Sequence, residues 1–272
     1  MRKTFILTGL TLALMVGTAN AAVSPLDLVA PISDYKIYVG GEVDKLVDAT
    51  QKFVNAIKAG DLETAKTLYG PSRVYYERVE PLAELFSDLD GAIDSRADDH
   101  EKKEEDPGFT GFHKVEYFLF SKGDTKAAAP VADQLIKDVK DLQGRIAGLT
   151  VEPKVMVGGA AGLIEEVASS KISGEEDRYS GTDLYDFQAN VDGAEKIVEL
   201  LHPLIVKEDA ALTGKIDGNF KTVDTVLAKY KTADGGYENY DKLTDKDRLA
   251  LQGPITELAE DLSRLTGTLG LE

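Results

Sequence analysis

Residues 39–57 read VGGEVDKLVDATQKFVNAI, and their apolar side chains recur every three or four positions. The apolar members are Val39, Val43, Leu46, Val47, Phe53, Val54 and Ile57. This spacing forms one apolar stripe along a helix, which predicts an amphipathic helix packed against a core. Gly60 and Asp61 follow the stripe. Because glycine ends helices and aspartate caps them, we expect this helix to stop there and another to begin.

The same periodicity continues outward along the chain. A second helix is predicted from Leu62, kinked or restarted at Gly70-Pro71, and resumed from Tyr75 to Phe86. The charge-dense stretch 95–108 predicts an exposed loop, and Gly123 should end the short helix that follows it. Later helices are predicted over residues 111–120, from Pro130 to 146, 153–167, from 183 past 200, 220–230 and 245–265. Strand-type alternation appears nowhere at useful length.

These helices predict an all-α fold of two consecutive four-helix bundles. The break at Gly148-Leu149-Thr150, ahead of Pro153, places the boundary near Gly148. We therefore expect an N-terminal bundle over residues 22–148 and a C-terminal bundle over residues 149–272.

The N-terminus has the organisation of a secretory signal peptide. Basic residues at positions 2–3 precede an apolar run over 4–16, and small residues at 17–22 end in an A-x-A-type cleavage site. The apolar run is shorter than the roughly 20 residues that span a bilayer, and no later segment approaches that length. We expect residues 1–21 to be removed and the mature protein to lie in the periplasm, without lipid attachment or membrane insertion.

Composition excludes several classes of function. The chain has no cysteine, so it carries no disulfide and no thiolate metal site. It has 48 acidic and 31 basic residues, and its formal net charge is −17 before two basic residues leave with the signal. Such a surface repels nucleic acid and attracts cations.

Two clusters can carry metal chemistry. His113 lies three residues before Glu116, so both side chains share one helical face within reach of one ion. Imidazole with carboxylates suits iron, zinc or copper. The alternative interpretation is a buried, hydrogen-bonded histidine beside a solvated glutamate.

Glu77 and Glu80 form the second cluster, one turn apart, with Glu84 continuing the row. Aligned like charges repel unless a cation or a basic partner lies among them. The alternative is a plain solvated face compensated by Arg73 and Arg78. Further acids that tertiary structure could add are Asp94 and the loop residues Glu175, Glu176 and Asp177.

Other features have ordinary explanations. We expect His100 to be exposed within its run of charges, and His202, before Pro203, to cap the end of a helix. The glycine-rich stretch 158–162 indicates close helix packing. The H-E-x-x-H, G-x-S-x-G and phosphate- or dinucleotide-binding glycine motifs are absent from the sequence.

The segment Gly111-Phe112-His113-Lys114-Val115-Glu116 resembles the G-x-H-x-x-E signature of imelysin-type proteins. This family was first classed as metallopeptidases and includes the periplasmic iron-uptake components EfeO and EfeM. The segments 75–81, 176–190 and 237–244 are similar to the same family, so the resemblance spans the mature chain. Longer members carry an N-terminal cupredoxin-like domain. We expect this chain to resemble the short, EfeM-like form without it, and a related alginate-associated binding protein of a sphingomonad.

The resemblance implies two four-helix bundles with a metal site in the cleft between them. The implied ligands are Glu77, Glu80, Asp94, His113, Glu116 and Glu176. Which of them share one ion and which support the others stays open. The implied function is a periplasmic metal-binding protein of an iron-uptake system, which captures Fe³⁺ or Fe²⁺ and delivers it to an inner-membrane permease. A periplasmic peroxidase is a further candidate partner, and zinc or copper are alternative metals.

Two other functions stay open at this point. A zinc-type metallopeptidase would use His113, Glu116 and one more acid, although no general base stands out. A protein that binds alginate or another acidic polysaccharide would need a bridging cation, because the acidic surface repels a polyuronate.

Overall fold

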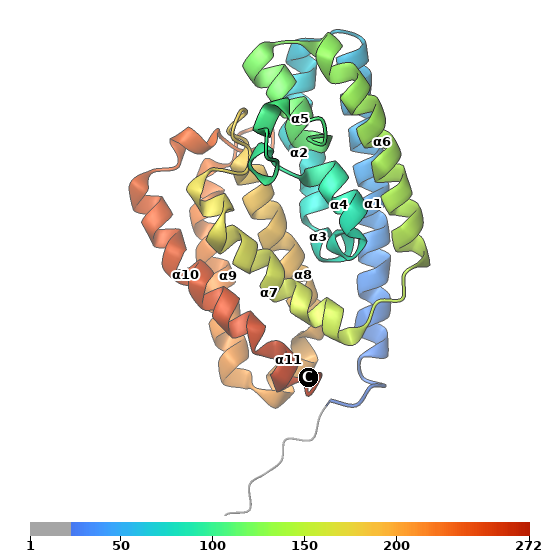
Figure 1. Cartoon of the computed structure of the whole chain (residues 1–272). Helices are drawn as coiled ribbons and strands as arrows, with labels where there is room; N and C mark the ends of the chain where they lie inside the picture. The colour runs from blue at the N-terminus through green and yellow to red at the C-terminus, as the bar shows by residue number, and fades with distance from the viewer. Residues whose placement is uncertain (1–22) are drawn as a thin grey trace, which may run out of the picture.

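The computed structural model describes residues 23–272, and every regular element in this part of the chain is a helix (Figure 1). The one β-type contact among these residues is an isolated bridge between Lys231 and Tyr237. The predicted all-α fold is therefore confirmed. The predicted signal peptide, residues 1–21, lies outside the described residues.

The helices differ widely in length. The long ones are α1 (Val29–Lys58), α2 (Leu62–Glu77), α6 (Thr125–Gly148), α7 (Pro153–Ser169), α8 (Asp183–Glu208), α9 (Ala210–Leu227) and α10 (Asp245–Ser263). The short ones are α3 (Glu80–Ala83), α4 (Ser87–Asp94), α5 (Gly111–Glu116) and α11 (Leu265–Thr268). Single 3₁₀ turns lie at Glu84–Phe86, Ala97–Asp99, Lys103–Glu105, Lys171–Ser173, Ala228–Tyr230 and Tyr240–Lys242. A π-helical turn, Tyr117–Lys122, follows α5 and ends, as predicted, at Gly123.

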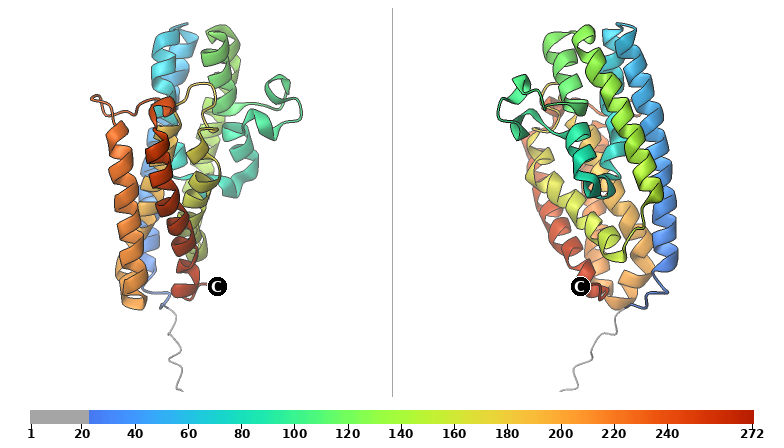
Figure 2. Two further views of the ribbon diagram at one scale, coloured as in Figure 1. Left: turned by 90° about the vertical axis from the view of Figure 1, so that its left-hand side faces the viewer. Right: turned by 45° about the vertical axis from the view of Figure 1, so that its right-hand side comes forward.

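Two groups of helices lie side by side (Figures 1 and 2). In one group α1 packs against α2 and α6, and α5 packs against α6. In the other, α7 and α9 each pack against α8 and α10. The groups are joined where α2 packs on α8 and α3 on α7, and buried apolar side chains of both belong to one cluster. The division into bundles at residue 148 stays a prediction.

None of the helices between residues 23 and 272 combines the length and apolar character that crossing a bilayer requires. The two ends of this part of the chain meet, since the Val23 N–H donates to the Leu269 carbonyl at 3.2 Å.

The predicted continuous helix from Tyr75 to Phe86 is wrong. α2 ends at Glu77, and α3 begins at Glu80 with Pro81 in its first turn. The physical reason is Pro81, which lacks the N–H that would bond to the Glu77 carbonyl if the helix continued. Glu77 and Glu80 therefore stand on either side of a break, not on one helical face.

The predicted restart at Gly70-Pro71 is wrong, because α2 runs through Pro71 as one helix, and the alternative of a kink there stays a prediction. Tyr69, Arg73 and Tyr76 are buried along α2, and their packing outweighs the hydrogen bond that the proline removes. Likewise α6 begins before Pro130, at Thr125, where the Asp124 side chain accepts the N–H groups of Lys126 and Ala127.

Both histidine predictions outside the site are corrected. His100 is half-buried, since its ring packs on Phe109 with centroids 5.5 Å apart and its Nε2 lies 3.0 Å from Ser95 Oγ. His202 does not cap a helix end, because α8 continues to Glu208. Its Nε2 lies 3.3 Å from an oxygen of Asp217 on α9.

Two glycines allow the close approaches that shape the site. Gly111 has φ +76°, and a Cβ there would lie 2.1 Å from the Ile93 carbonyl oxygen. Only glycine therefore lets α5 begin directly against the end of α4, which brings residues 94 and 113 together. Gly159 of α7 packs on Pro81, where a Cβ would lie 2.8 Å from the proline ring. The close packing predicted for the glycine-rich stretch is therefore found at Gly159, whereas a Cβ at Gly158 or Gly162 would meet nothing within 4 Å.

Candidate metal centre

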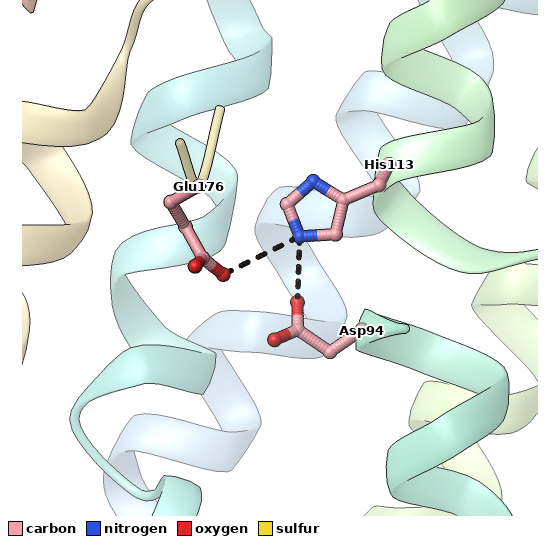
Figure 3. Close-up of side chains that lie close together, drawn as sticks. All are labelled: Asp94, His113 and Glu176. Carbon is pink, nitrogen blue, oxygen red and sulfur yellow. Dashed lines mark ion pairs between the residues drawn. The ribbon is translucent and has the colours of Figure 1, made fainter. Parts of the chain in front are cut away.

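His113 lies at the middle of a cluster of acidic side chains. It is in the first turn of α5, and its side chain is almost fully buried. Its Nε2 lies 3.6 Å from an Asp94 oxygen at the end of α4 and 3.5 Å from a Glu176 oxygen in the loop before α8 (Figure 3). These three ligand atoms are close enough together to hold one metal ion. The Nε2 atom is buried and has no hydrogen-bond partner.

The other ring nitrogen faces a second set of oxygens. Nδ1 lies 3.3 Å from Glu116 Oε2, 3.4 Å from the Tyr69 hydroxyl and 3.8 Å from Asp177 Oδ1. His113, Glu116 and Asp177 also lie close enough to hold an ion. A histidine held at one nitrogen by a carboxylate presents the other nitrogen in a fixed direction, as outer-shell partners of metal ligands do.

The loop between α7 and α8 is fixed to α5 through Glu116. Glu116 Oε1 accepts the backbone N–H groups of Tyr179 and Ser180 at 2.9 and 2.7 Å, and the Ser180 hydroxyl at 2.9 Å. At the start of α8, Asp183 Oδ1 accepts the N–H groups of Glu176 and Asp177 at 3.1 and 3.2 Å. These bonds hold Glu176 over His113.

Arg73, fully buried on α2, binds the same carboxylates from behind. Its guanidinium lies 2.5 Å from Glu77, 2.5 Å from Asp94 and 2.9 Å from Asp186. It also lies 3.6 Å from Glu176 and 3.5 Å from Asp177. The guanidinium thus offsets part of the repulsion among buried acids, which would be costly if unpaired.

Glu77 and Glu80 are buried, which rules out the plain solvated face considered for them from the sequence. Arg73 does contact Glu77, and a further cation, the fully buried Lys171, contacts both carboxylates. Asn190 Nδ2 donates to Glu77 Oε2 at 3.2 Å and to Glu80 Oε2 at 3.1 Å. Of the six predicted ligands, Asp94, His113 and Glu176 therefore form one group, Glu116 lies on the far side of the imidazole, and Glu77 and Glu80 adjoin Lys171. Their roles as ligands stay predictions.

The electrostatics of the cluster favour a cation. Burial and Arg73 lower the pKa of His113, but Glu116, Glu176 and Asp94 outweigh them and raise it to about 10. Burial raises the pKa of Glu77 to about 7, although Lys171 and Arg73 lower it, and burial raises that of Glu80 well above its usual value. Burial also opposes the charge of Glu176, yet Lys171 and His113 hold its pKa well below the ordinary range.

An acidic hollow of about 320 Å³ opens beside the cluster. Asp94 and Glu176 are among the seven carboxylate side chains that line it, and Arg96 is its one basic side chain. At His113 itself the free space is only about 10 Å³, near the minimum for one water molecule. A cation can therefore approach through the hollow towards Asp94 and Glu176, before it reaches the imidazole.

Sequence reasoning missed Lys171 and Asn190. Arg73, which the sequence offered as a compensating charge for Glu77 and Glu80, stands four residues before Glu77 on α2 and does pair with it. Lys171 and Asn190 gave no local signal, because only the packing of α7 and α8 against the α2–α3 break brings them in.

Known proteins resemble this chain over most of its length. The family model described as Imelysin matches residues 31–265, which include His113, its neighbouring acids and both groups of helices. The chain belongs to the imelysin family. This imelysin is 60% identical over 273 residues to the protein named iron uptake system component EfeM of Pseudomonas syringae, covering 100% of this chain and 96% of the relative. It is 63% identical over 255 residues to iron uptake system component EfeO of Yersinia pseudotuberculosis, covering 93% of this chain and 68% of the relative. It is 62% identical over 257 residues to EfeO of Escherichia coli O1:K1, covering 94% of this chain and 68% of the relative.

Proposed function

We propose that this protein captures an iron ion in the periplasm, holds it between Asp94, His113 and Glu176, and passes it to an inner-membrane permease. The observation that carries the proposal is His113 Nε2, which is buried without a partner between two carboxylates. The metal is iron because the relatives are named iron-uptake components, and oxygen ligands with one imidazole suit it.

Different residues have different roles in capturing the ion. The acidic hollow raises the local concentration of cations and leads them to Asp94 and Glu176. His113 becomes a ligand by losing a proton, so binding releases a proton and weakens at low pH. Glu116 holds the ring through Nδ1 and ties α5 to the loop that carries Glu176.

The test is an anaerobic titration of the mature protein with ferrous iron, repeated with zinc and copper. His113→Gln, Asp94→Asn and Glu176→Gln should each weaken iron binding by more than the roughly 10- to 100-fold that loss of an outer-shell partner costs. The matched control is His202→Gln, because His202 lies on α8 beside Asp217, outside the cluster. Equal iron affinity for wild type and all three site variants would show that the proposal is wrong.

A further inference from the structure

Lys171 occupies a position where carboxylates from three elements converge. It opens the 3₁₀ turn directly after α7, and its side chain is fully buried. Its Nζ hydrogen-bonds to Glu77 Oε2 and lies 3.6 Å from Glu80 Oε2 and 3.4 Å from Glu166 Oε1. The ammonium is therefore the counter-ion of carboxylates that adjoin the proposed iron site.

The lysine stays charged in this position. Its ammonium forms ion pairs with Glu77 and Glu80. Buried charges persist only when they are paired, so the lysine and the two glutamates stabilise one another.

The two glutamates have positioning partners other than Lys171. Asn190 Nδ2 bridges Glu77 Oε2 and Glu80 Oε2, and it also donates to the Glu77 backbone carbonyl at 3.0 Å. Arg73 holds the other oxygen of Glu77 at 2.5 Å. Because these contacts fix both carboxylates, the ammonium chiefly supplies positive charge.

Lys171 also lies next to the route of entry. Glu80 and Glu166, two of its three carboxylate partners, line the acidic hollow together with Asp94 and Glu176. The ammonium therefore lies beside the hollow through which a cation reaches Asp94 and Glu176, and a long lysine side chain can swing outward.

We propose that Lys171 is a tethered cation that competes with the captured metal: it pairs with Glu77 and Glu80 in the empty protein and leaves for the acidic hollow when iron binds beside them, between Asp94, His113 and Glu176. This inference rests on the proposed function. In the empty protein the ammonium stabilises the buried carboxylates. In the loaded protein it competes with the ion and lowers the affinity for iron, which allows the ion to be passed on.

Removing the competing charge should tighten binding. In an anaerobic ferrous titration, Lys171→Gln should bind iron about tenfold or more tightly than wild type, since a unit charge a few ångströms away acts strongly in a buried site. Lys171→Arg keeps the charge and should show no gain. Lys154→Gln, at the exposed start of α7, makes the same change in net charge and should leave the affinity unchanged. Unchanged or weaker binding by Lys171→Gln would mean that the lysine only positions its partners.

A second measurement needs no variant. Amine acetylation of wild type, read by mass spectrometry, should leave Lys171 protected in the metal-free protein and modify it several-fold faster after iron is added. Equal protection with and without iron would overturn the exchange. Equal iron binding by the wild type and His113→Gln would refute the proposed function. Iron binding that requires His113 but leaves Lys171 protected would refute only the exchange of the lysine.

Discussion

At the scale of single residues, the two nitrogens of His113 have different environments. Nε2 faces Asp94 and Glu176 without a hydrogen-bond partner, whereas Nδ1 faces Glu116, Tyr69 and Asp177. Glu116 uses its second oxygen to accept three donors from residues 179 and 180. Because both oxygens of Glu116 already have partners, this carboxylate orients the imidazole and the loop. We infer that it acts on the ion through His113.

Glu116→Ala should therefore affect both stability and metal binding. It leaves the half-buried N–H groups of Tyr179 and Ser180 without their carboxylate acceptor, which should lower the free energy of unfolding by about 1 kcal/mol. Iron affinity should fall roughly 10- to 100-fold, as for other outer-shell partners. Urea denaturation and metal titration measure the two effects. Glu116→Gln is the control, because its amide oxygen can still accept the loop donors and should recover most of the stability.

The sequence predicted His113 and Glu116 as a pair because both lie on one short helix, where spacing alone sets their distance. It could not tell which ring nitrogen Glu116 would meet. It also could not reveal Lys171, because nothing in the residues around position 171 indicates that α7 ends against Glu77 and Glu80.

At the scale of elements, the junctions between short helices position the site. The α2–α3 break places Glu77 and Glu80 beside Lys171, and Gly111 lets α5 begin against the last turn of α4. Apolar periodicity predicted the long helices because each buries one continuous stripe. It failed at Pro71, Pro81 and Pro130, where local capping and tertiary packing decide whether a proline is accommodated or ends the helix.

Gly111→Ala should disrupt the α4–α5 junction. The left-handed backbone alone costs about 1–2 kcal/mol for a residue with a Cβ, and the contact with the Ile93 carbonyl adds to this. We expect a loss of unfolding free energy of at least about 2 kcal/mol together with weaker iron binding, measured by denaturation and titration. The control is Gly91→Ala in α4, where no atom lies within 4 Å of the new Cβ. That change should be neutral or stabilising by about 0.5–1 kcal/mol, and a similar loss in both variants would contradict this explanation.

At the scale of the whole molecule, the net charge is −17, and acidic side chains cluster in the interior around three buried basic ones. These are Arg73, His113 and Lys171. The composition predicted that the protein attracts cations, but it could not show where on the protein they would bind. The acids come from α2, α3, α4, α5, α8 and the loop before α8, so only the assembled fold brings them together. The two-bundle division stays a prediction, since the buried core and this cluster both extend across it.

The same cluster predicts how the stability of the metal-free protein depends on pH. His113 has a pKa of about 10 in the folded protein, above the usual 6.5, so the folded state binds more protons across that window. The free energy of unfolding should therefore fall between pH 7 and 9.5, by about 1 kcal/mol or more, since one pKa unit corresponds to about 1.4 kcal/mol. Urea denaturation in the presence of a chelator measures this. His113→Gln should flatten the dependence, and a wild-type stability that rises over this range would contradict the assignment.

The proposed function places one iron ion between Asp94, His113 and Glu176. A crystal structure of the iron-loaded mature protein, with anomalous scattering recorded at the iron edge, locates the ion. We expect an anomalous peak within bonding distance of His113 Nε2 and of oxygens from Asp94 and Glu176. A peak on the Nδ1 side, between Glu116 and Asp177, or one remote from His113 would contradict it.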